Sequence, residues 1–427
     1  MLIRRGLATV AAAMSATLVL AACSGGGSGD DGGPVTLRMT VWTSNKPHLE
    51  LFNEIAATYK KNHPEIKDIK FDPLPFETYS TALTTQMTGG NAPDLAWVFE
   101  TDAADFVGSG ALVPLDDTLK QTSGYQYDDL LPSTTKLWKS DDKLYAYPFS
   151  TSPFGVFVNR DLLKKAGQKT PDQLLKAGKW DWPTVLAEGS EVHRSTGKAG
   201  MVIRDFEYKE WGNLAAFWGG WKAEPWSADG KTCTFDSKPM VDAMTTLHKG
   251  IFEDKAMPGP GETADFFTGD SAMTITQISR ASLLEGAKFA WDLVPLPAGP
   301  SGDYSVIGQA GIGVVKRGGH TKEAKDFLAY FTNPQNSAKL AAYFPPPRAS
   351  QLTAENLAKT NPLLKNDQLD SVVVDGVKKG VVKPGHTGQA ELAQRVRAGL
   401  DPLWKPDADV KGVLGDLCGN ISQLLEN

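Results

Sequence analysis

Between Pro34 and Gly110 the apolar residues follow two spacings in turn, one typical of β-strands and one typical of α-helices. This order restricts the possible folds more than any other feature of the sequence. Apolar and polar residues alternate one by one in 34–42, which predicts a β-strand ending at Trp42. In 48–62 the apolar residues recur at helical spacing, which predicts an amphipathic helix. Strands are expected next at 66–71 and 95–99, and helices at 78–88 and 102–108. This β-α-β-α-β order predicts a parallel α/β sheet with helices on its faces.

The rest of the chain continues the mixture of strands and helices. Strands are expected at 154–159, 272–276, 293–295 and 312–315, and helices at 160–166, 183–195, 239–250, 321–332 and 336–343. Three prolines at 345–347 interrupt the chain, and the tail from Ala354 is expected to be mostly helical. A chain of 427 residues is long enough for two domains.

The region before Pro34 has the parts of an export signal. Arg4 and Arg5 precede a short apolar run, which ends in Leu20-Ala21-Ala22-Cys23. This ending resembles the lipobox of bacterial lipoproteins, which implies that residues 1–22 are a signal peptide and that Cys23 carries a diacylglycerol. A Gly/Ser linker, 23–34, would then tether the protein outside the cytoplasmic membrane.

Two other interpretations of this region remain open. A signal-anchor helix is disfavoured because the apolar run is shorter than the roughly 20 residues of a membrane span. The arginine pair also fits the twin-arginine export route, although ordinary Sec export needs only positive charge at this place.

The charge and the cysteine and histidine content bear on three questions: nucleic-acid binding, disulfides and metal sites. The net charge of −6 and the lack of a basic patch argue against nucleic-acid binding. Cys233 and Cys418 remain after Cys23; in an oxidising compartment they form either a disulfide or two separate thiols, and the sequence leaves both open. The six histidines are scattered and no Cys-x-x-Cys motif occurs, so neither a metal site nor a cofactor is predicted.

Several short motifs occur in a fixed order along the chain. They are Tyr79 with Gly-Gly-Asn-Ala-Pro-Asp-Leu at 89–95, Gly-Ala-Leu-Val-Pro-Leu at 110–115, Tyr147-Pro148, Asn-Arg-Asp-Leu-Leu at 159–163, Trp182-Pro183, Phe-Thr-Gly-Asp-Ser-Ala-Met at 267–273 and Lys-Glu-Ala-Lys-Asp-Phe at 322–327. In this order and spacing the chain resembles the maltose-binding-type extracellular solute-binding proteins, the sugar receptors of ABC importers.

The resemblance implies a two-lobed periplasmic-binding-protein fold of the α/β class. Each lobe would be a sheet flanked by helices, and three crossings of the chain would form a hinge. Lobe one is expected at 35–150 plus 295–346, and lobe two at 151–294 plus 347–427. The ligand would lie between the lobes and be trapped by hinge closure.

Candidate ligand-binding residues come first from the predicted strand ends. Trp42 ends a strand and Asn45 follows it, while Glu100 and Thr101 follow the strand at 95–99. Open α/β sheets bind ligands at such carboxyl ends. The resemblance adds Ser152, where relatives often have a glutamate, and Gln277 and Arg280, where many have a stacking tryptophan. It further adds the aromatic residues Tyr208 and Trp211, and Arg348 as a cleft candidate.

The expected function is that of a non-enzymatic receptor, a monomer that binds an oligosaccharide and delivers it to an ABC permease. Aromatic rings suit the C–H faces of a sugar, and polar side chains suit its hydroxyls. One alternative is the same fold binding glycerol-3-phosphate, a polyamine or a peptide. Another is a secreted glycoside hydrolase with paired carboxylates.

A Cys23→Ala variant tests the lipid anchor. It should be released from cells and support sugar uptake poorly, because the lipid keeps the receptor near the permease. The purified variant should bind ligand as the wild type does. Cell fractionation measures the release, and normal membrane retention of the variant would contradict lipidation at Cys23.

Overall fold

The computed structural model describes residues 33–383 and 385–426, so the predicted signal peptide and Cys23 lie outside the described residues. Within the described ranges, no helix has both the length and the apolar character needed to cross a bilayer. The first elements match the predicted alternation: β1 (Val35–Val41), α1 (Lys46–Lys60), β2 (Ile66–Pro73), α2 (Tyr79–Thr88), β3 (Leu95–Phe99) and α3 (Ala103–Gly108). β1 pairs in parallel with both β2 and β3, which confirms the predicted parallel α/β arrangement.

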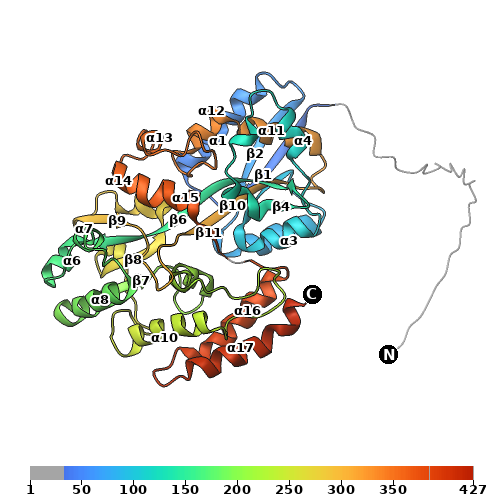
Figure 1. Ribbon diagram of the computed structural model, residues 1–427. Helices are drawn as coiled ribbons and strands as arrows, with labels where there is room; N and C mark the ends of the chain where they lie inside the picture. Colours follow the sequence, from blue (N-terminus) through green and yellow to red (C-terminus); the bar gives the residue numbers. More distant parts are fainter. Residues whose placement is uncertain (1–32, 384, 427) are drawn as a thin grey trace, which may run out of the picture.

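The middle of the chain completes the first body and then builds a second one. The elements of this part of the chain are α4 (Asp116–Gln121), α5 (Pro132–Thr135), β4 (Lys139–Ser140), β5 (Lys143–Leu144), β6 (Ala146–Asn159), α6 (Arg160–Lys165), α7 (Pro171–Lys176), α8 (Trp182–Thr196), β7 (Ala199–Ile203), α9 (Ala215–Trp218), α10 (Lys238–Phe252), β8 (Ser271–Gln277) and β9 (Trp291–Val294). α4, α5, β4 and β5 still belong to the first body, and β6 leads from one body into the other (Figure 1).

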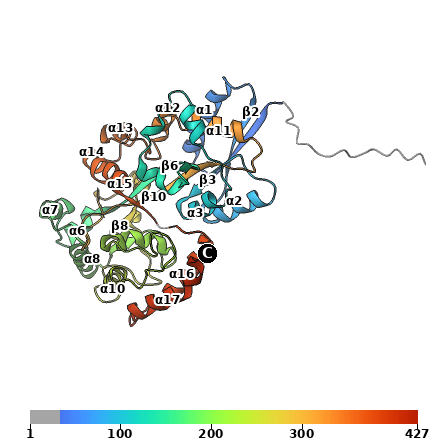
Figure 2. The same cartoon turned by 45° about the vertical axis from the view of Figure 1, so that its right-hand side comes forward.

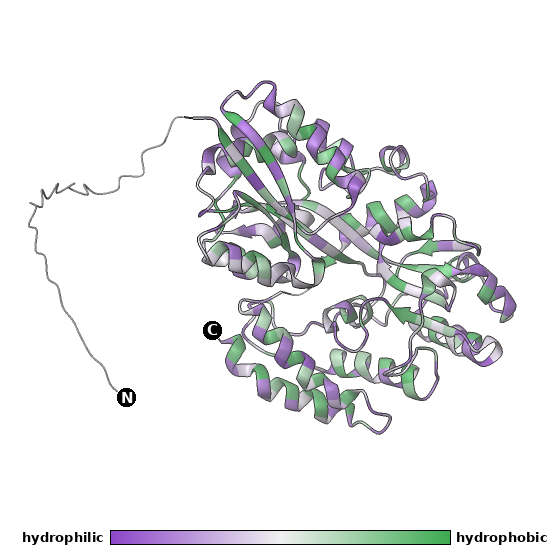
Figure 3. Ribbon diagram, turned by 180° about the vertical axis from the view of Figure 1, so that it is seen from behind, coloured by the Kyte–Doolittle hydropathy of each residue, from purple (hydrophilic) through white to green (hydrophobic). Residues whose placement is uncertain are grey.

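The last part returns to the first body and then covers the second. It comprises β10 (Val306–Val314), α11 (Thr321–Phe331), α12 (Pro334–Leu340), α13 (Ala354–Ala358), α14 (Asn366–Gln368), α15 (Asp375–Lys379), β11 (Val381–Val382), α16 (Gln389–Leu400) and α17 (Val410–Leu425). In Figure 3 the two C-terminal helices carry green and purple residues side by side, as expected of helices that bury one face.

The hydrophobic core is divided in two at β6. One core contains β6 residues up to Phe149 together with β1, β3 and α11; we call the body around it lobe one. The other contains β6 residues from Phe154 together with β7, β8, α10 and α17; we call its body lobe two. α13–α15 pack against the opposite face of the lobe-two strands through residues such as Leu357 and Val377. The lobe boundaries expected from the sequence stay a prediction.

A single sheet joins the lobes, in the strand order β2-β1-β3-β10-β6-β8-β7. The first half of β6 pairs with β10, and its second half pairs with β8 and β9. Figures 1 and 2 show β6 and β10 crossing between the two bodies. Pro148 is tolerated in β6 because Ala310 pairs with Ser150 and Ile312 with Tyr147, which leaves a bulge opposite Gly311.

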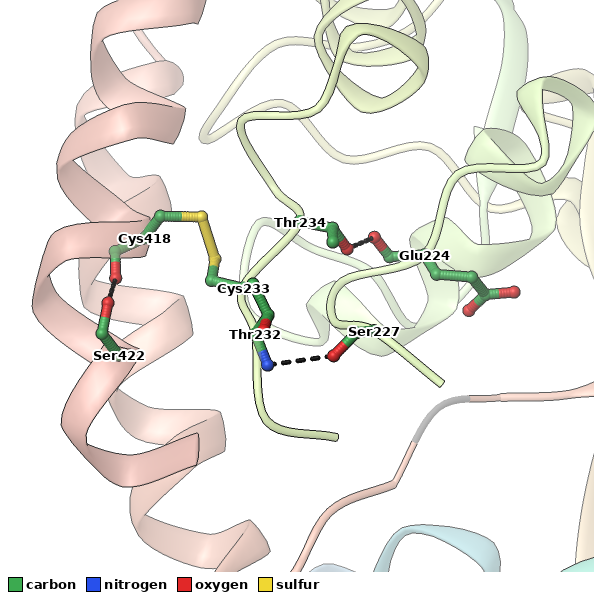
Figure 4. Close-up of a disulfide and its surroundings, with 7 residues drawn as sticks. All are labelled: Glu224, Ser227, Thr232, Cys233, Thr234, Cys418 and Ser422. Atoms are coloured by element: carbon green, nitrogen blue, oxygen red, sulfur yellow. Dashed lines mark hydrogen bonds between the residues drawn. A yellow bond between two sulfur atoms is a disulfide. The ribbon is translucent and has the colours of Figure 1, made fainter. Parts of the chain in front are cut away.

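Cys233 and Cys418 are joined by a disulfide, so the structure decides between the two possibilities that the sequence left open. The bond ties α17 to the loop that contains Ser227 and Thr232 (Figure 4). Its two cysteines are separated by 185 residues, so the cross-link restricts a large part of the unfolded chain.

A Cys233→Ser/Cys418→Ser double variant should lose about 2–4 kcal/mol of unfolding free energy, because the unfolded chain regains entropy. Thermal unfolding measures the loss. Dithiothreitol should lower the melting temperature of the wild type toward that of the double variant and leave the double variant unchanged. Equal melting temperatures of wild type and variant without reductant would contradict a stabilising disulfide.

Glu188 of α8 is buried in lobe two, and its Oε2 atom has no hydrogen-bond partner among the described residues. Burial raises the pKa of the Glu188 carboxyl to about 7, from an ordinary value of 4.5. Between these two pH values the folded protein keeps a proton that the unfolded chain has lost. Stability therefore falls as pH rises through this window, and the loss is complete above pH 7.

Glu188→Gln should remove this loss. The variant should exceed the wild type in stability by about 2–3 kcal/mol at pH 8, and the difference should shrink as the pH falls toward 4.5. Melting temperatures across this range test it. Glu285→Gln, which changes an exposed carboxyl, is the matched control and should show no such trend. A pH-independent difference for Glu188→Gln would refute the raised pKa.

Candidate ligand-binding site

Strand ends from both lobes point toward the middle of the shared sheet. In lobe one the parallel strands β1 and β3 end at Val41 and Phe99. In lobe two the parallel strands β7 and β8 end at Ile203 and Gln277. The carboxyl ends of parallel strands in open α/β sheets are the usual place of ligand binding.

The pairing register brings the two sets of ends close together. Phe99 pairs with Ala310 of β10, and Ala310 pairs with Ser150 of β6. Gln277 pairs with Phe154 of the same strand. Ser150 and Phe154 are four residues apart, which corresponds to about 13 Å along a strand. The residues that follow β3 and β8 therefore flank one short stretch of β6.

An aromatic surface lies at the lobe-one strand ends. Trp42 stacks on Phe99 with ring centroids 4.2 Å apart. Phe76 meets the edges of both rings, at 6.4 Å from Trp42 and 5.1 Å from Phe99, and is 55% exposed. Trp97 and Tyr79 are buried against Trp42 and support it. Trp42, Phe76 and Phe99 can therefore present an apolar face to a ligand; Phe76 was not predicted, because nothing in the sequence shows that this side chain stays exposed.

Asn45 serves a local structural role. Its side-chain oxygen accepts a hydrogen bond from the backbone N–H of His48, at 3.3 Å, and caps the start of α1. Asn45 is exposed and lies three residues after Trp42 in the chain.

Glu100 follows β3 and is nearly buried, and its carboxylate lies 2.9 Å from Nζ of Lys383. The same ammonium lies 3.3 Å from Oδ1 of Asn213 in lobe two and 5.8 Å from the centre of the Phe154 ring. Lys383 thus connects the two lobes and β6 at one point. It follows a two-residue strand and carries no local pattern, so the sequence did not predict it.

Two further carboxylates, those of Asp102 and Asp105, follow Glu100 in the chain. Burial, together with the neighbouring charges of Glu100 and Asp105, raises the pKa of the Asp102 carboxyl to about 6. Hydrogen bonds from the hydroxyls of Ser80 and Thr101 oppose this shift. The loop that the sequence singled out at Glu100 and Thr101 therefore concentrates polar groups at the junction of the lobes.

The loop after β7 adopts an unusual backbone. Asp205, Glu207 and Tyr208 have φ angles of 60°, 41° and 57°, in the left-handed region that side chains disfavour. Strain of this kind clusters at binding sites. The Tyr208 hydroxyl donates to the carbonyl of Pro258 and burial raises its pKa, so Tyr208 is held within lobe two.

The residues after β8 are also engaged by neighbours. The Arg280 guanidinium donates to the Asp205 carboxylate, and burial lowers the pKa of the guanidinium. Gln277 lies against β10, where a Cβ on Gly308 would be 2.9 Å from its side-chain nitrogen. The hydroxyl of Ser152 accepts from the backbone N–H of Ser279, at 3.2 Å, and is buried.

Two predicted site residues lie in the interior instead. Trp211 is 5% exposed and donates its indole N–H to the carbonyl of Ala393, at 3.2 Å. Arg348 has no exposed surface and donates to three backbone carbonyls, those of Tyr125, Gln126 and Thr332. Both placements correct the expectation of a ligand contact in this structure, because the polar groups are already used in packing.

Two surface cavities are lined mainly by residues other than those at the strand ends. One, of about 310 Å³, is lined by Trp180, Tyr304 and Asp375 and touches Phe154. The other, of about 530 Å³, is lined by Tyr59 and Tyr330 of lobe one. The candidate site is therefore defined by strand ends and their side chains rather than by either cavity.

Comparison with known proteins decides the family. Residues 44–338 match the family model for bacterial extracellular solute-binding proteins. The chain belongs to this family. The resemblance found in the sequence motifs is thereby confirmed, and members of the family are binding proteins.

Three similar proteins illustrate the range of this solute-binding family. An uncharacterized lipoprotein in the oleD 5′ region of Streptomyces antibioticus is 25% identical over 339 residues, which cover 76% of this chain and 72% of that protein. The sn-glycerol-3-phosphate-binding periplasmic protein UgpB of Escherichia coli is 27% identical over 319 residues, 68% of this chain and 69% of that protein. The crystal structure of the cyclic alpha-maltosyl-1,6-maltose binding protein from Arthrobacter globiformis superimposes with a TM-score of 0.78 at 16% identity, covering 92% of this chain and 100% of that one, which confirms the two-lobed fold.

Proposed function

We propose that this protein is the receptor of an ABC importer and binds an oligosaccharide between its two lobes. The observation that carries the proposal is the surface of Trp42, Phe76 and Phe99 beside the Glu100–Lys383 pair, where strand ends of both lobes converge. Aromatic rings pack on the C–H faces of a sugar, and the paired charges accept and donate hydrogen bonds to its hydroxyls. The similarity in fold to a maltosyl-maltose binding protein supports this choice.

Ligand contacts are assigned from both sides of the sheet centre. Trp42, Phe76, Phe99, Glu100 and Thr101 contribute from lobe one, and Lys383 from the segment after β11. Gln277 and Arg280 contribute from lobe two. Closure of the lobes about β6, β10 and the connection at 345–348 would bring the two groups onto one ligand.

A phosphorylated ligand is the second candidate, because UgpB is a relative. Three cations near the strand ends already have a carboxylate partner: Lys383 has Glu100, Arg280 has Asp205 and Arg204 has Asp265. A phosphate group would have to displace one of these carboxylates, since phosphate sites need unpaired positive charge or helix N-termini. A neutral polyol needs no such displacement and fits better.

The location and partners follow from the family and the N-terminal motif. We infer a lipid anchor at Cys23 on the outer side of the cytoplasmic membrane, a monomeric receptor and an ABC permease as its protein partner. The relative named as a lipoprotein in Streptomyces supports the anchor. We infer no catalysis, because Glu100 and Asp105 near the site are both held in contacts within the protein.

A ligand panel tests the proposal. Maltose, longer linear and cyclic maltosaccharides and sn-glycerol-3-phosphate are each added to the purified protein, and the melting temperature is measured, because a ligand that binds the folded state raises it. A neutral saccharide should raise it. A rise with glycerol-3-phosphate alone would favour the second candidate, and release of free sugar would indicate a hydrolase.

Phe76→Ala should weaken binding of the saccharide by about 2- to 13-fold, since an aromatic contact contributes roughly 0.5–1.5 kcal/mol. Phe76 is exposed, so the melting temperature without ligand should change little. Leu175→Ala removes an exposed apolar side chain of α7 and is the control. Isothermal titration calorimetry measures both, and equal affinities would remove Phe76 from the site.

A further inference from the structure

Helix α16 of lobe two is capped by a residue of lobe one. Its own N-cap position is Gly388, which has no side chain to accept a hydrogen bond. Instead the carboxylate of Asp105, in α3, accepts from the backbone N–H of Gly388 at 2.7 Å and of Gln389 at 3.3 Å. α16 lies beneath α3 in both Figure 1 and Figure 2. The start of a 12-residue helix in one lobe therefore depends on an anion in the other.

The segment that leads into α16 touches the same loop of lobe one. We call residues 383 and 385–389 the bridging segment. Lys383 forms the nearly buried ion pair with Glu100. The backbone at Gly385 lies so close that a Cβ there would be 3.1 Å and 3.3 Å from the carbonyl oxygens of Glu100 and Thr101. With Asp105, three successive contacts hold the bridging segment against the loop after β3 and the first turn of α3.

The bridging segment is also fixed to lobe two. Nε2 of His386 lies 2.9 Å from the carbonyl oxygen of Gly230, and its ring packs edge-on against Trp226. The disulfide from Cys233 to Cys418 ties the same loop to α17. Because of these contacts, we expect the bridging segment to move together with lobe two and not independently of it.

We propose that Asp105 is a positioning residue for the ligand site. Its carboxylate holds the bridging segment, and with it Lys383, against Glu100 and biases the two lobes toward the arrangement of this structure, in which these contacts form. Separation of the lobes would leave the first N–H groups of α16 without their acceptor. The proposal rests on the proposed function in one respect, that a ligand binds between the lobes; the bias on the lobes themselves does not need a ligand.

Asp105→Ala should move the ligand-free protein toward a more open arrangement. Small-angle X-ray scattering should show a larger radius of gyration than for the wild type, and a pair of spin labels on α1 and α10 should show longer distances. The saccharide that binds the wild type should bind the variant about 3- to 30-fold more weakly, the range expected for loss of a helix cap, with the change mainly in the dissociation rate. Asp105→Asn keeps one acceptor oxygen and should lie between the two.

Asp409→Ala is the matched control. Asp409 caps α17 by accepting from the N–H of Gly412 at 3.1 Å, and both residues lie in lobe two. This variant should lose a similar amount of thermal stability, while its label distances and ligand affinity stay those of the wild type.

Wild-type distances and affinity in Asp105→Ala would overturn the proposal and leave Asp105 as a helix cap alone. Equal opening in Asp409→Ala would overturn it too. If no saccharide binds the wild type, the proposed function fails, whereas the distance measurements still decide the role of Asp105.

Discussion

The two lobes share one antiparallel strand pair, β6 with β10, which runs from one hydrophobic core into the other. A strand buried on both faces must keep its backbone groups hydrogen-bonded. β6 therefore takes β8 and β9 as partners where its pairing with β10 ends, between Pro153 and Phe154. This change of partner places the strand ends of both lobes next to each other. The position of the candidate site is a direct consequence of it.

The third connection between the lobes is anchored differently. After the three prolines, Arg348 is enclosed in lobe one, where it donates to the carbonyls of Tyr125 and Thr332. Upstream, the hydroxyl of Thr151 in β6 donates to the carbonyl of Pro345, at 2.9 Å. A buried guanidinium must be satisfied by hydrogen bonds, so Arg348 fixes where the chain leaves lobe one. Arg348 thereby anchors the third connection between the lobes.

The regular alternation of strand and helix was predictable because each element between 34 and 108 buries one face, and burial imposes a period of two or of 3.6 residues. β7 was not predicted, and β6 and β10 were predicted too short. The first half of β6 contains Pro148 and Pro153, and β10 contains Gly308, Gly311 and Gly313, all of which disfavour strands locally. Only pairing across the sheet, with a bulge at Pro148, makes these segments strands.

The sequence by itself determined the family motifs, the parallel sheet of lobe one and the placement of Trp42, Glu100 and Thr101 at strand ends, because these depend on residues near one another in the chain. The tertiary structure alone decided the disulfide, the burial of Trp211 and Arg348, and the meeting of Lys383 and Asp105 with partners from the other lobe. Lys383 and Glu100 are far apart in sequence, and no local pattern records such a contact. Desolvating the two charges costs free energy, and their mutual attraction offsets this cost only when they are brought together, which requires that both lobes have formed.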